Sequence, residues 1–363
     1  MKTNEEIVLS VIIISHEQRE QLRRCVDSVL DMHLPFAFEL ILSDDRSKDG
    51  TFELAQDYER RLEELQKENS YLVRVIATQC NSDECHPANN SHRSGYNRCN
   101  GYRYAQGKYI AHADGDDFFR PGAKVYERQV EALKKHSECA IAMGSCLTLE
   151  DGKPLSTAIP HRFPRKMIDG EVISAAQYIN EGLYVYNPTM IQRRNPNVDP
   201  TRLYGKLYVD YVTTFHHLQF GSIVYVDACD YVYVQYPNSI AHKLVKQNRD
   251  KEVLWNMGLY IPVLMPIWTK LMYMGSYYPR IRETIKLARS GYKLQPANYE
   301  SLRELHVWIY DCFARPLTWC DKARLFITDR WMVMMRKTGW QNKKPSCFLF
   351  CHPVYKSNGS SVL

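Results

Sequence analysis

Apolar and polar residues follow two different rhythms along the first 240 positions. Short apolar runs rich in β-branched residues, such as residues 7–15, are typical of strands buried on both faces of a parallel sheet. Other stretches repeat their apolar residues every three or four positions, as residues 22–30 do, which predicts amphipathic helices. This alternation of strands and helices predicts an α/β fold of the doubly wound kind.

The individual elements follow from the same pattern. The predicted strands span residues 7–15, 38–43, 72–78, 109–112, 140–149, 188–192, 223–227 and 231–236. The predicted helices lie at residues 22–30, 51–67, 95–105, 121–135 and 208–220. Pro121 would occupy the first turn of its helix, where the missing N–H costs nothing. Residues 79–94 are expected to form a long loop and residues 151–165 a linker or an excursion from the sheet.

After residue 240 the pattern turns helical and the charge changes sign. Residues 1–240 carry 27 Lys and Arg against 33 Asp and Glu, whereas residues 241–363 carry 20 against 8. We therefore divide the chain into an α/β domain, residues 1–240, and a basic, mainly helical region, residues 241–363. A basic segment interleaved with aromatic residues suits an anionic surface such as phospholipid headgroups, and the open alternative is a solvated basic face over an aromatic core. The residues expected at a membrane surface are Arg324, Phe326, Trp331, Met334, Met335, Arg336 and Lys337.

The remaining bulk features concern location. The first 15 residues lack the pattern of a signal peptide, and the longest apolar stretch, residues 257–268, is shorter than the ~20 residues of a membrane-spanning helix. The 11 cysteines are not spaced as in a disulfide-rich protein, and they include no CxxC pair typical of a structural zinc site. We expect a cytoplasmic protein with free thiols that can rest on the inner membrane face.

Three polar clusters fall at the carboxyl ends of predicted strands. They are Ser15-His16-Glu17, Asp44-Asp45 and Asp114-Gly115-Asp116-Asp117. In an open α/β sheet this edge is where ligands bind. The sequence therefore predicts a single site that draws on the first, second and fourth strands.

Each acidic cluster has two interpretations. Three carboxylates within residues 114–117 suit a hard divalent ion, Mg²⁺ or Mn²⁺, that bridges to a diphosphate, and the alternative is a solvated turn. A carboxylate at Asp44 or Asp45 can accept the imide N–H of uracil, or it can cap the following helix. Of the acidic residues in this stretch, Asp49 is the better cap and Asp45 the better ligand.

Four motifs in the same order and spacing resemble the family 2 inverting glycosyltransferases over about the first 125 residues. They are the strand at residues 9–15, the stretch from Glu39 to Thr51 with its paired aspartates, the stretch from Gly101 to Ile110, and the Asp-x-Asp of Asp114 and Asp116. Each motif is weak alone, and four in register are a specific signal. The resemblance implies a GT-A fold for residues 1–240, a nucleotide-sugar donor and a divalent metal.

Carried over by position, the resemblance assigns roles to individual residues. Asp45 would contact the base, Asp114 the ribose or sugar region and the metal, and Asp116 the metal and the diphosphate. His16 stands where the family usually has a Tyr beside the base. The other positions implied for the nucleotide are Ser15, Glu17 and Arg98.

The resemblance also indicates a catalytic base. The family places an Asp at the start of a helix that ends in a Gly before the next strand, and here Val209-Asp210-Tyr211 and Gly221 match that arrangement. Asp210 would take the proton of the acceptor hydroxyl. The alternative is an acidic residue that the helix dipole favours in a first turn.

The expected function is the transfer of a sugar from a nucleotide-diphosphate donor, with UDP as the expected nucleotide. The acceptor would be a saccharide or a lipid-linked acceptor in surface polysaccharide or glycolipid synthesis, and no nucleic acid is expected as a partner. Departures from the family pattern, such as Arg46 where a Gly is usual and Cys99 where an Asn is usual, leave the base and the sugar open. The alternatives are a sugar nucleotidyltransferase, which usually has a Gly-rich loop after its first strand, and an inactive nucleotide-sugar-binding or scaffolding protein.

Overall fold

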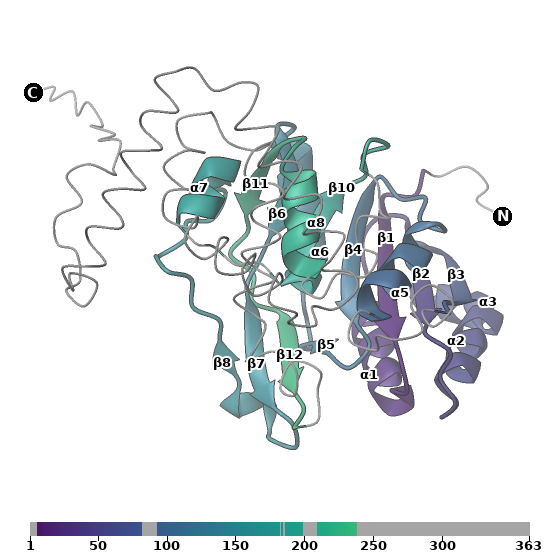
Figure 1. The fold of residues 1–363 in the computed structure, drawn as a ribbon. Helices are drawn as coiled ribbons and strands as arrows, with labels where there is room; N and C mark the ends of the chain where they lie inside the picture. Colours follow the sequence, from purple (N-terminus) through teal and green to yellow (C-terminus); the bar gives the residue numbers. More distant parts are fainter. Residues whose placement is uncertain (1–5, 82–92, 182, 184–185, 199–208, 238–363) are drawn as a thin grey trace, which may run out of the picture.

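A large mixed sheet with helices on both faces forms the centre of the molecule, and a smaller sheet lies beside it (Figure 1). The computed structural model describes residues 6–81, 93–181, 183, 186–198 and 209–237. The basic region expected over residues 241–363 lies outside the described residues. The predicted α/β class is confirmed. Within the described residues, no helix combines the length and the apolar character needed to cross a bilayer.

The elements are distributed over two sheets. The large sheet has the order β3-β2-β1-β4-β10-β6-β11-β9 and the small one β5-β12-β7-β8. The large sheet consists of β1 (Leu9–Ser15), β2 (Phe38–Asp44), β3 (Leu72–Gln79), β4 (Tyr109–Asp114), β6 (Cys139–Met143), β9 (Val172–Ile173), β10 (Met190–Arg193) and β11 (Ser222–Tyr225), and the small sheet of β5 (Phe118–Phe119), β7 (Cys146–Glu150), β8 (Ile159–Pro160) and β12 (Tyr231–Gln235). The helices are α1 (Arg19–Leu30), α2 (Thr51–Arg60), α3 (Leu62–Glu68), α5 (Arg93–Tyr102), α6 (Val125–Lys135), α7 (Ala175–Asn180) and α8 (Val209–His217), with 3-10 turns η2 (Leu155–Thr157) and η3 (Asn187–Thr189).

The two faces of the sheet are set by the alternation of side chains along each strand. Ile12 and Ile14 of β1 pack in the cluster that includes Tyr102 of α5, whereas Val11 and Ile13 pack with α1, α2 and α6. Every residue of β1 and β2 is buried, as expected for strands covered on both faces. The apolar stripe predicted within residues 22–30 is the buried side of α1.

The helix predicted over residues 51–67 is instead two helices that meet at Arg61. Arg61 has φ −87° and ψ 13°, outside helical geometry. The break separates α2, which buries Leu54, Ala55 and Tyr58, from α3, which has no fully buried residue. The α2 segment can therefore follow the core while α3 stays at the surface.

The helix predicted over residues 121–135 begins later, at Val125. Gly122 has a φ of 72°, which a right-handed helix cannot contain, so Pro121 lies in the preceding turn and not in the first helical turn. The amide of Lys124 donates to the Asp230 carboxylate at 3.0 Å. This partner is distant in sequence and fixes where the helix starts.

The strand predicted over residues 140–149 is two strands in different sheets, β6 and β7. The chain turns at Gly144, where a Cβ atom would lie 2.9 Å from the Ala228 carbonyl oxygen. The amides of Gly144 and Ser145 donate to the carbonyls of Thr189 and Ala228, at 2.8 and 2.7 Å. Tertiary backbone contacts therefore divide an apolar run that is continuous in sequence.

One buried carboxylate, Glu39 of β2, ties together the amino edge of the sheet. It accepts hydrogen bonds from the Ser10 hydroxyl at 2.5 Å and from the amides of Gln106 and Gly107 at 2.7 and 3.2 Å. Its other oxygen pairs with Arg74 at 2.5 Å. Glu39 is fully buried, so its charge is stable there only because these donors surround it.

We expect Glu39→Gln to lower the free energy of unfolding by about 2–4 kcal/mol, because the new amide NH₂ would face groups that are themselves donors. Urea unfolding followed by circular dichroism measures the change. Glu63→Gln, on the exposed side of α3, is the matched control and should change stability by less than about 0.5 kcal/mol. Equal stability of the two variants would contradict the role given to Glu39.

Candidate functional site

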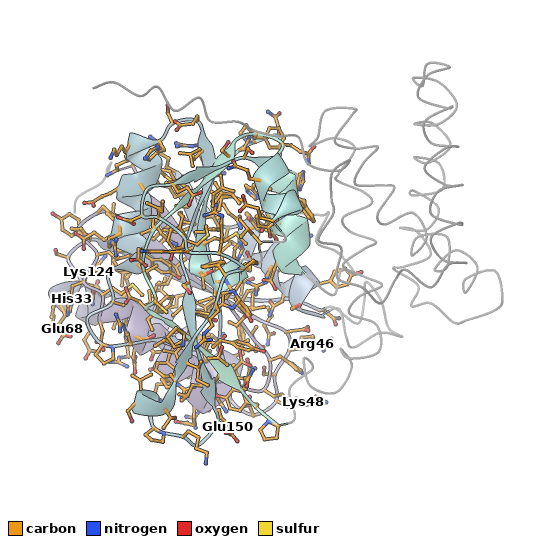
Figure 2. The ribbon with its side chains drawn as sticks, turned by 90° about the vertical axis from the view of Figure 1, so that its left-hand side faces the viewer. His33, Arg46, Lys48, Glu68, Lys124 and Glu150 are labelled. Atoms are coloured by element: carbon orange, nitrogen blue, oxygen red, sulfur yellow. The ribbon has the colours of Figure 1, made fainter. Side chains whose placement is uncertain are left out.

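The three polar clusters meet at the carboxyl edge of the large sheet. In the parallel register, Ser15 of β1 lies opposite Asp44 of β2, and Ile14 lies opposite Asp114 of β4. Figure 2 shows Arg46 and Lys48, which follow β2, on one side of the domain, and His33 and Glu68, which precede β2 and β3, on the other. The order of the strands reverses between β1 and β4, which is the place where α/β sheets bind ligands.

The ends of β1 and β2 are joined through His16 and Asp45. The amide of Asp45 donates to the Ser15 carbonyl at 3.0 Å, and Nδ1 of His16 lies 2.9 Å from the Asp45 carbonyl oxygen. The Asp45 residue is 1% exposed. The predicted residues Ser15, His16 and Asp45 therefore form one connected wall of the edge.

The turns that follow β1 and β2 each contain a residue with a strained backbone conformation. Glu17 and Arg46 have φ values of 52° and 54°, a left-handed conformation that non-glycine residues rarely adopt. The amide of Glu17 donates to the Ser47 hydroxyl at 2.7 Å, which holds the two turns together. Such strain gathers where a ligand site fixes the backbone. At residue 46, where family members usually have Gly, an Arg adopts the conformation that Gly adopts easily.

Two other aspartates in the same stretch, Asp44 and Asp49, have structural roles. The Asp44 carboxylate is buried and accepts the Ser47 amide at 2.8 Å, together with the Ser47 hydroxyl. Asp49 accepts the amides of Thr51 and Arg19, at 3.0 and 3.2 Å, which are the first residues of α2 and of α1. Although desolvation raises the pKa of Asp49, these hydrogen bonds outweigh it and lower the pKa below its usual value. The N-cap position of α2 is Gly50, so Asp49 binds the first amide of the helix from one residue before the position that a capping side chain usually occupies.

Asn97 of α5 is a site residue that the sequence pattern did not reveal. Its side-chain NH₂ donates to the carbonyls of Ser15 and Ser43 at 3.1 and 2.9 Å, and its oxygen accepts the Ser43 hydroxyl at 2.6 Å. It therefore fixes the ends of β1 and β2 relative to each other from beneath. The only signal was a polar residue on the sheet-facing side of a predicted helix.

Arg98 and Asp114 form a partly buried ion pair between α5 and β4. Asp114 lies on the same face of β4 as Ile110, which packs against α5, and Nη2 of Arg98 reaches its carboxylate at 2.5 Å. Arg98 is 2% exposed, and its Nε and Nη1 have no acceptor among the described residues. Positive charge and donor groups at this edge suit an anionic ligand.

The acidic turn after β4 separates into a site carboxylate and a structural one. Asp117 is buried, and its carboxylate accepts the Tyr231 hydroxyl and the Val234 amide, the latter at 2.7 Å, so it joins β4 to the small sheet. Burial raises the pKa of Asp117 well above its usual value, and Asp116 and Asp114 add to the shift. Asp117 is therefore committed to the fold.

The Asp116 carboxylate is desolvated and lies near a second carboxylate, so a nearby positive charge would stabilise it. Burial raises its pKa to about 7, and the Asp114 carboxylate contributes further. Its backbone carbonyl is fixed by the Arg24 guanidinium and the Tyr236 hydroxyl, at 3.0 and 3.1 Å. The Tyr236 hydroxyl therefore touches the acidic turn itself.

The two carboxylates fit a divalent cation that shares its coordination with a substrate. A desolvated carboxylate near a second one is relieved by a hard cation, whose preferred ligands are oxygen atoms. Among the described residues, no three His, Cys, Asp or Glu side chains are grouped as a complete protein cage for a metal. Asp114 and Asp116 would therefore supply part of the coordination, and phosphate oxygens and water the rest.

Asp210 reaches the same edge from α8. It lies in the first turn of that helix, and its Oδ1 accepts the amide of Asn187 at 2.8 Å. Asn187 begins η3, which leads into β10, and β10 pairs with β4 in antiparallel register, with Ile191 opposite Ala111. The chain before β10 consequently lies next to the end of β4, which brings Asp210 toward the acidic turn.

A family comparison agrees with this geometry. Residues 10–148 match the family described as glycosyl transferase family 2. The matched stretch is less than half of the chain. It contains Ser15, His16, Asp45, Asp114 and Asp116, whereas Asp210 lies beyond it. The position of Asp210 therefore depends on the structure and not on the family match.

Two curated relatives illustrate how much of the chain is shared. The putative teichuronic acid biosynthesis glycosyltransferase TuaG of Bacillus subtilis is 32% identical over 158 residues, which are 43% of this chain and 54% of that protein. The uncharacterized protein Rv1520 of Mycobacterium tuberculosis is 23% identical over 241 residues, 66% of this chain and 62% of the relative. The chain thus spans little more than half of the lengths of these relatives.

The fold is shared with solved structures of the S. aureus protein TarS. Its residues 1–349 in complex with UDP-GlcNAc superpose with a TM-score of 0.55 at 15% identity, over 92% of each chain. The corresponding complex with UDP gives 0.53 at 14% identity, again over 92% of each chain. The GT-A fold expected from the resemblance is confirmed.

Proposed function

We propose that this chain is an inverting, metal-dependent glycosyltransferase that moves a sugar from a UDP-sugar to an acceptor hydroxyl. The observation that carries the proposal is the convergence of Asp45, Asp114, Asp116 and Asp210 at the carboxyl edge of the large sheet. A nucleotide-binding wall, a pair of carboxylates for a cation and a helix-borne base are the parts that such a transfer needs. Asp45 would read the base, and Arg98 would face the nucleotide from beside Asp114.

The comparisons support the same proposal. A protein with this fold, TarS, is described in complex with UDP and with UDP-GlcNAc. The relative from Bacillus subtilis is described as a glycosyltransferase of teichuronic acid biosynthesis, which favours a role in surface polysaccharide synthesis for this chain. Contact of residues 241–363 with a membrane surface, and a cytoplasmic location, stay predictions.

In the proposed reaction the acceptor oxygen attacks the anomeric carbon while the bond from that carbon to the diphosphate oxygen breaks. The bonding electron pair leaves with UDP, and the proton of the acceptor hydroxyl passes to Asp210. The Asn187 amide, 2.8 Å from Oδ1, keeps the Asp210 carboxylate in one orientation. A divalent cation held by Asp114 and Asp116 would neutralise charge on the diphosphate. One displacement inverts the anomeric centre.

A thermal-shift panel of UDP, GDP and dTDP, each with and without Mn²⁺, tests the proposal on the full chain. UDP with Mn²⁺ should stabilise the protein most, by ~2.7 kcal/mol at about 100 times its dissociation constant. UMP is the matched control, because it keeps the base and lacks the diphosphate that a cation would bridge. The proposal fails if no nucleotide stabilises the protein, or if Mn²⁺ makes no difference to UDP.

A further inference from the structure

A continuous row of aromatic rings leads away from the candidate site. The aromatic row consists of Tyr233, Tyr186, His161 and Phe163, whose successive ring centroids are 5.5, 5.3 and 5.0 Å apart. Phe163 in turn packs on Tyr225 of β11, with centroids 5.7 Å apart. The four rings come from β12, from the chain just before η3 and from the segment after β8. Segments distant in sequence therefore build one surface.

One end of the aromatic row lies near the proposed base, Asp210, and near the acidic turn after β4. Tyr186 directly precedes Asn187, whose amide holds the Asp210 carboxylate. Tyr233 lies two residues after Tyr231, whose hydroxyl bonds to Asp117 of the acidic turn. The charges of that turn also act on Tyr233. Burial raises the pKa of its phenol, and the carboxylates of Asp117 and Asp116 raise it further. The row thus starts between the proposed base and the proposed cation site.

The rings of the aromatic row are only partly covered. All four residues are half-buried, in contrast to Tyr109, Tyr126 and Tyr178, which the core covers completely. Burial lowers the pKa of His161, so its ring is neutral at pH 7. Half-covered rings offer an apolar, electron-rich face, and the two tyrosines and His161 add a hydroxyl or imidazole group at the edge. Sugars and polyols have the complementary chemistry, because their C–H faces pack on rings while their hydroxyls bond at the edge.

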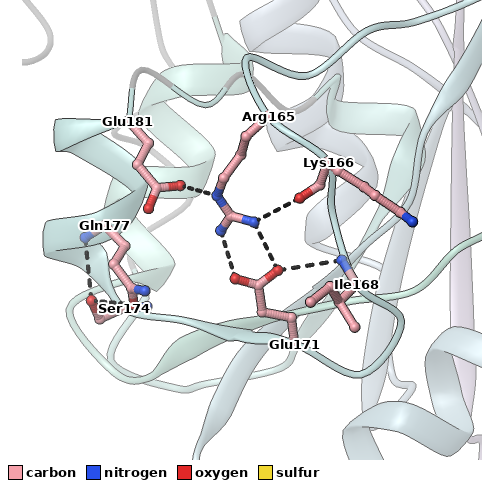
Figure 3. Close-up of polar contacts among 7 residues, drawn as sticks. All are labelled: Arg165, Lys166, Ile168, Glu171, Ser174, Gln177 and Glu181. Atoms are coloured by element: carbon pink, nitrogen blue, oxygen red, sulfur yellow. Dashed lines mark hydrogen bonds and ion pairs between the residues drawn. The ribbon is translucent and has the colours of Figure 1, made fainter. Parts of the chain in front are cut away.

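The segment that carries His161 and Phe163 is firmly held. The Arg165 guanidinium donates to both oxygens of Glu171, at 2.6 and 2.9 Å, and to Glu181 at 2.7 Å (Figure 3). At the other end, the His161 amide donates to the Cys146 carbonyl at 2.8 Å. A surface held at both ends loses little freedom when a ligand binds, which favours affinity.

We propose that the aromatic row is the acceptor-binding surface and that it takes a chain of sugar or polyol units, with the terminal unit beside Asp210. The inference rests on the proposed function. The spacing of the ring centroids is close to the length of one sugar unit in a chain. Two of the three neighbouring ring pairs are perpendicular, so each added unit would gain a further ring contact with either a face or an edge. A single sugar would contact only the Tyr233 and Tyr186 end.

An array of immobilised single sugars, oligosaccharides and polyol-phosphate oligomers of increasing length, probed with the full chain in UDP and Mn²⁺, tests the inference. The wild type should bind chains more tightly than single units. Tyr186→Leu and Tyr233→Leu should each weaken chain binding by about fivefold to tenfold, as expected for the loss of one ring contact. Tyr186→Phe, which keeps the ring and loses only the hydroxyl, should weaken chain binding less than Tyr186→Leu does. Tyr104→Leu, at an exposed tyrosine on the amino edge of the sheet, should bind as the wild type does.

UDP-dependent thermal stabilisation, measured on every variant, separates this inference from the proposed function. Retained UDP stabilisation with weakened chain binding in the two leucine variants supports the aromatic row as the acceptor site. Three outcomes overturn it while UDP still binds: no binding to any array member, equal binding of single units and chains, or unaffected leucine variants. Absence of UDP binding in the wild type overturns the proposed function and this inference together.

Discussion

Replacing Asp210 by asparagine is expected to lower turnover by about two to four orders of magnitude, the usual contribution of a general base, while the affinity for UDP stays unchanged. The substitution removes the group that accepts the acceptor's proton but preserves its shape. The Asn187 amide, which now donates to Oδ1 at 2.8 Å, can donate equally to an amide oxygen, so the local fold should persist. UDP release from the donor, measured with the tightest acceptor found on the array, gives the turnover number.

The matched control for this variant is Glu53→Gln. Glu53 is also acidic and also lies in the first turn of a helix, α2, so its substitution removes the same favourable contact with a helix dipole. Only the Asp210 variant should lose turnover. Full activity of Asp210→Asn, or an equal loss in both variants, would show that Asp210 only stabilises the first turn of its helix.

The second large effect is expected at Asp116. Asp116→Asn should weaken Mn²⁺-dependent UDP binding by at least about 100-fold, because even the loss of residues that only support metal ligands costs 10–100-fold. Binding of UDP without the metal should change little. Isothermal titration of UDP at saturating Mn²⁺ and in a chelator separates the two quantities.

The same variant should gain stability, or lose none, when metal and nucleotide are absent. Desolvation raises the pKa of Asp116 to about 7, and the neighbouring Asp114 adds to the rise, so the folded chain is under electrostatic strain that asparagine removes. Opposite signs for stability and for ligand binding mark a functional carboxylate. Glu150→Gln, at the exposed end of β7, should change neither. Unaltered Mn²⁺-dependent affinity in Asp116→Asn would remove Asp116 from the cation site.

The sequence alone determined much of the carboxyl edge of the sheet, where the donor is proposed to bind. Apolar runs rich in β-branched residues become buried strands because both faces of a central sheet exclude water, so the strands that end at Ser15, Asp44 and Asp114 could be predicted from local pattern. Parallel strands then bring their carboxyl ends to one edge. These are short-range regularities, and residues 10–148 contain nearly all of them.

Other features depended on contacts between distant parts of the chain, and only the tertiary structure decided them. Asp116 and Asp117 are neighbours of identical chemistry, yet Tyr231 and Val234 bind one of them into the fold and leave the other to the site. The run at residues 140–149 divides because Gly144 meets the Ala228 carbonyl. The aromatic row and the hydrogen bond from Asn187 to Asp210 also join remote segments. Local sequence pattern records the period of burial, whereas such pairings depend on which surfaces the folded chain brings together.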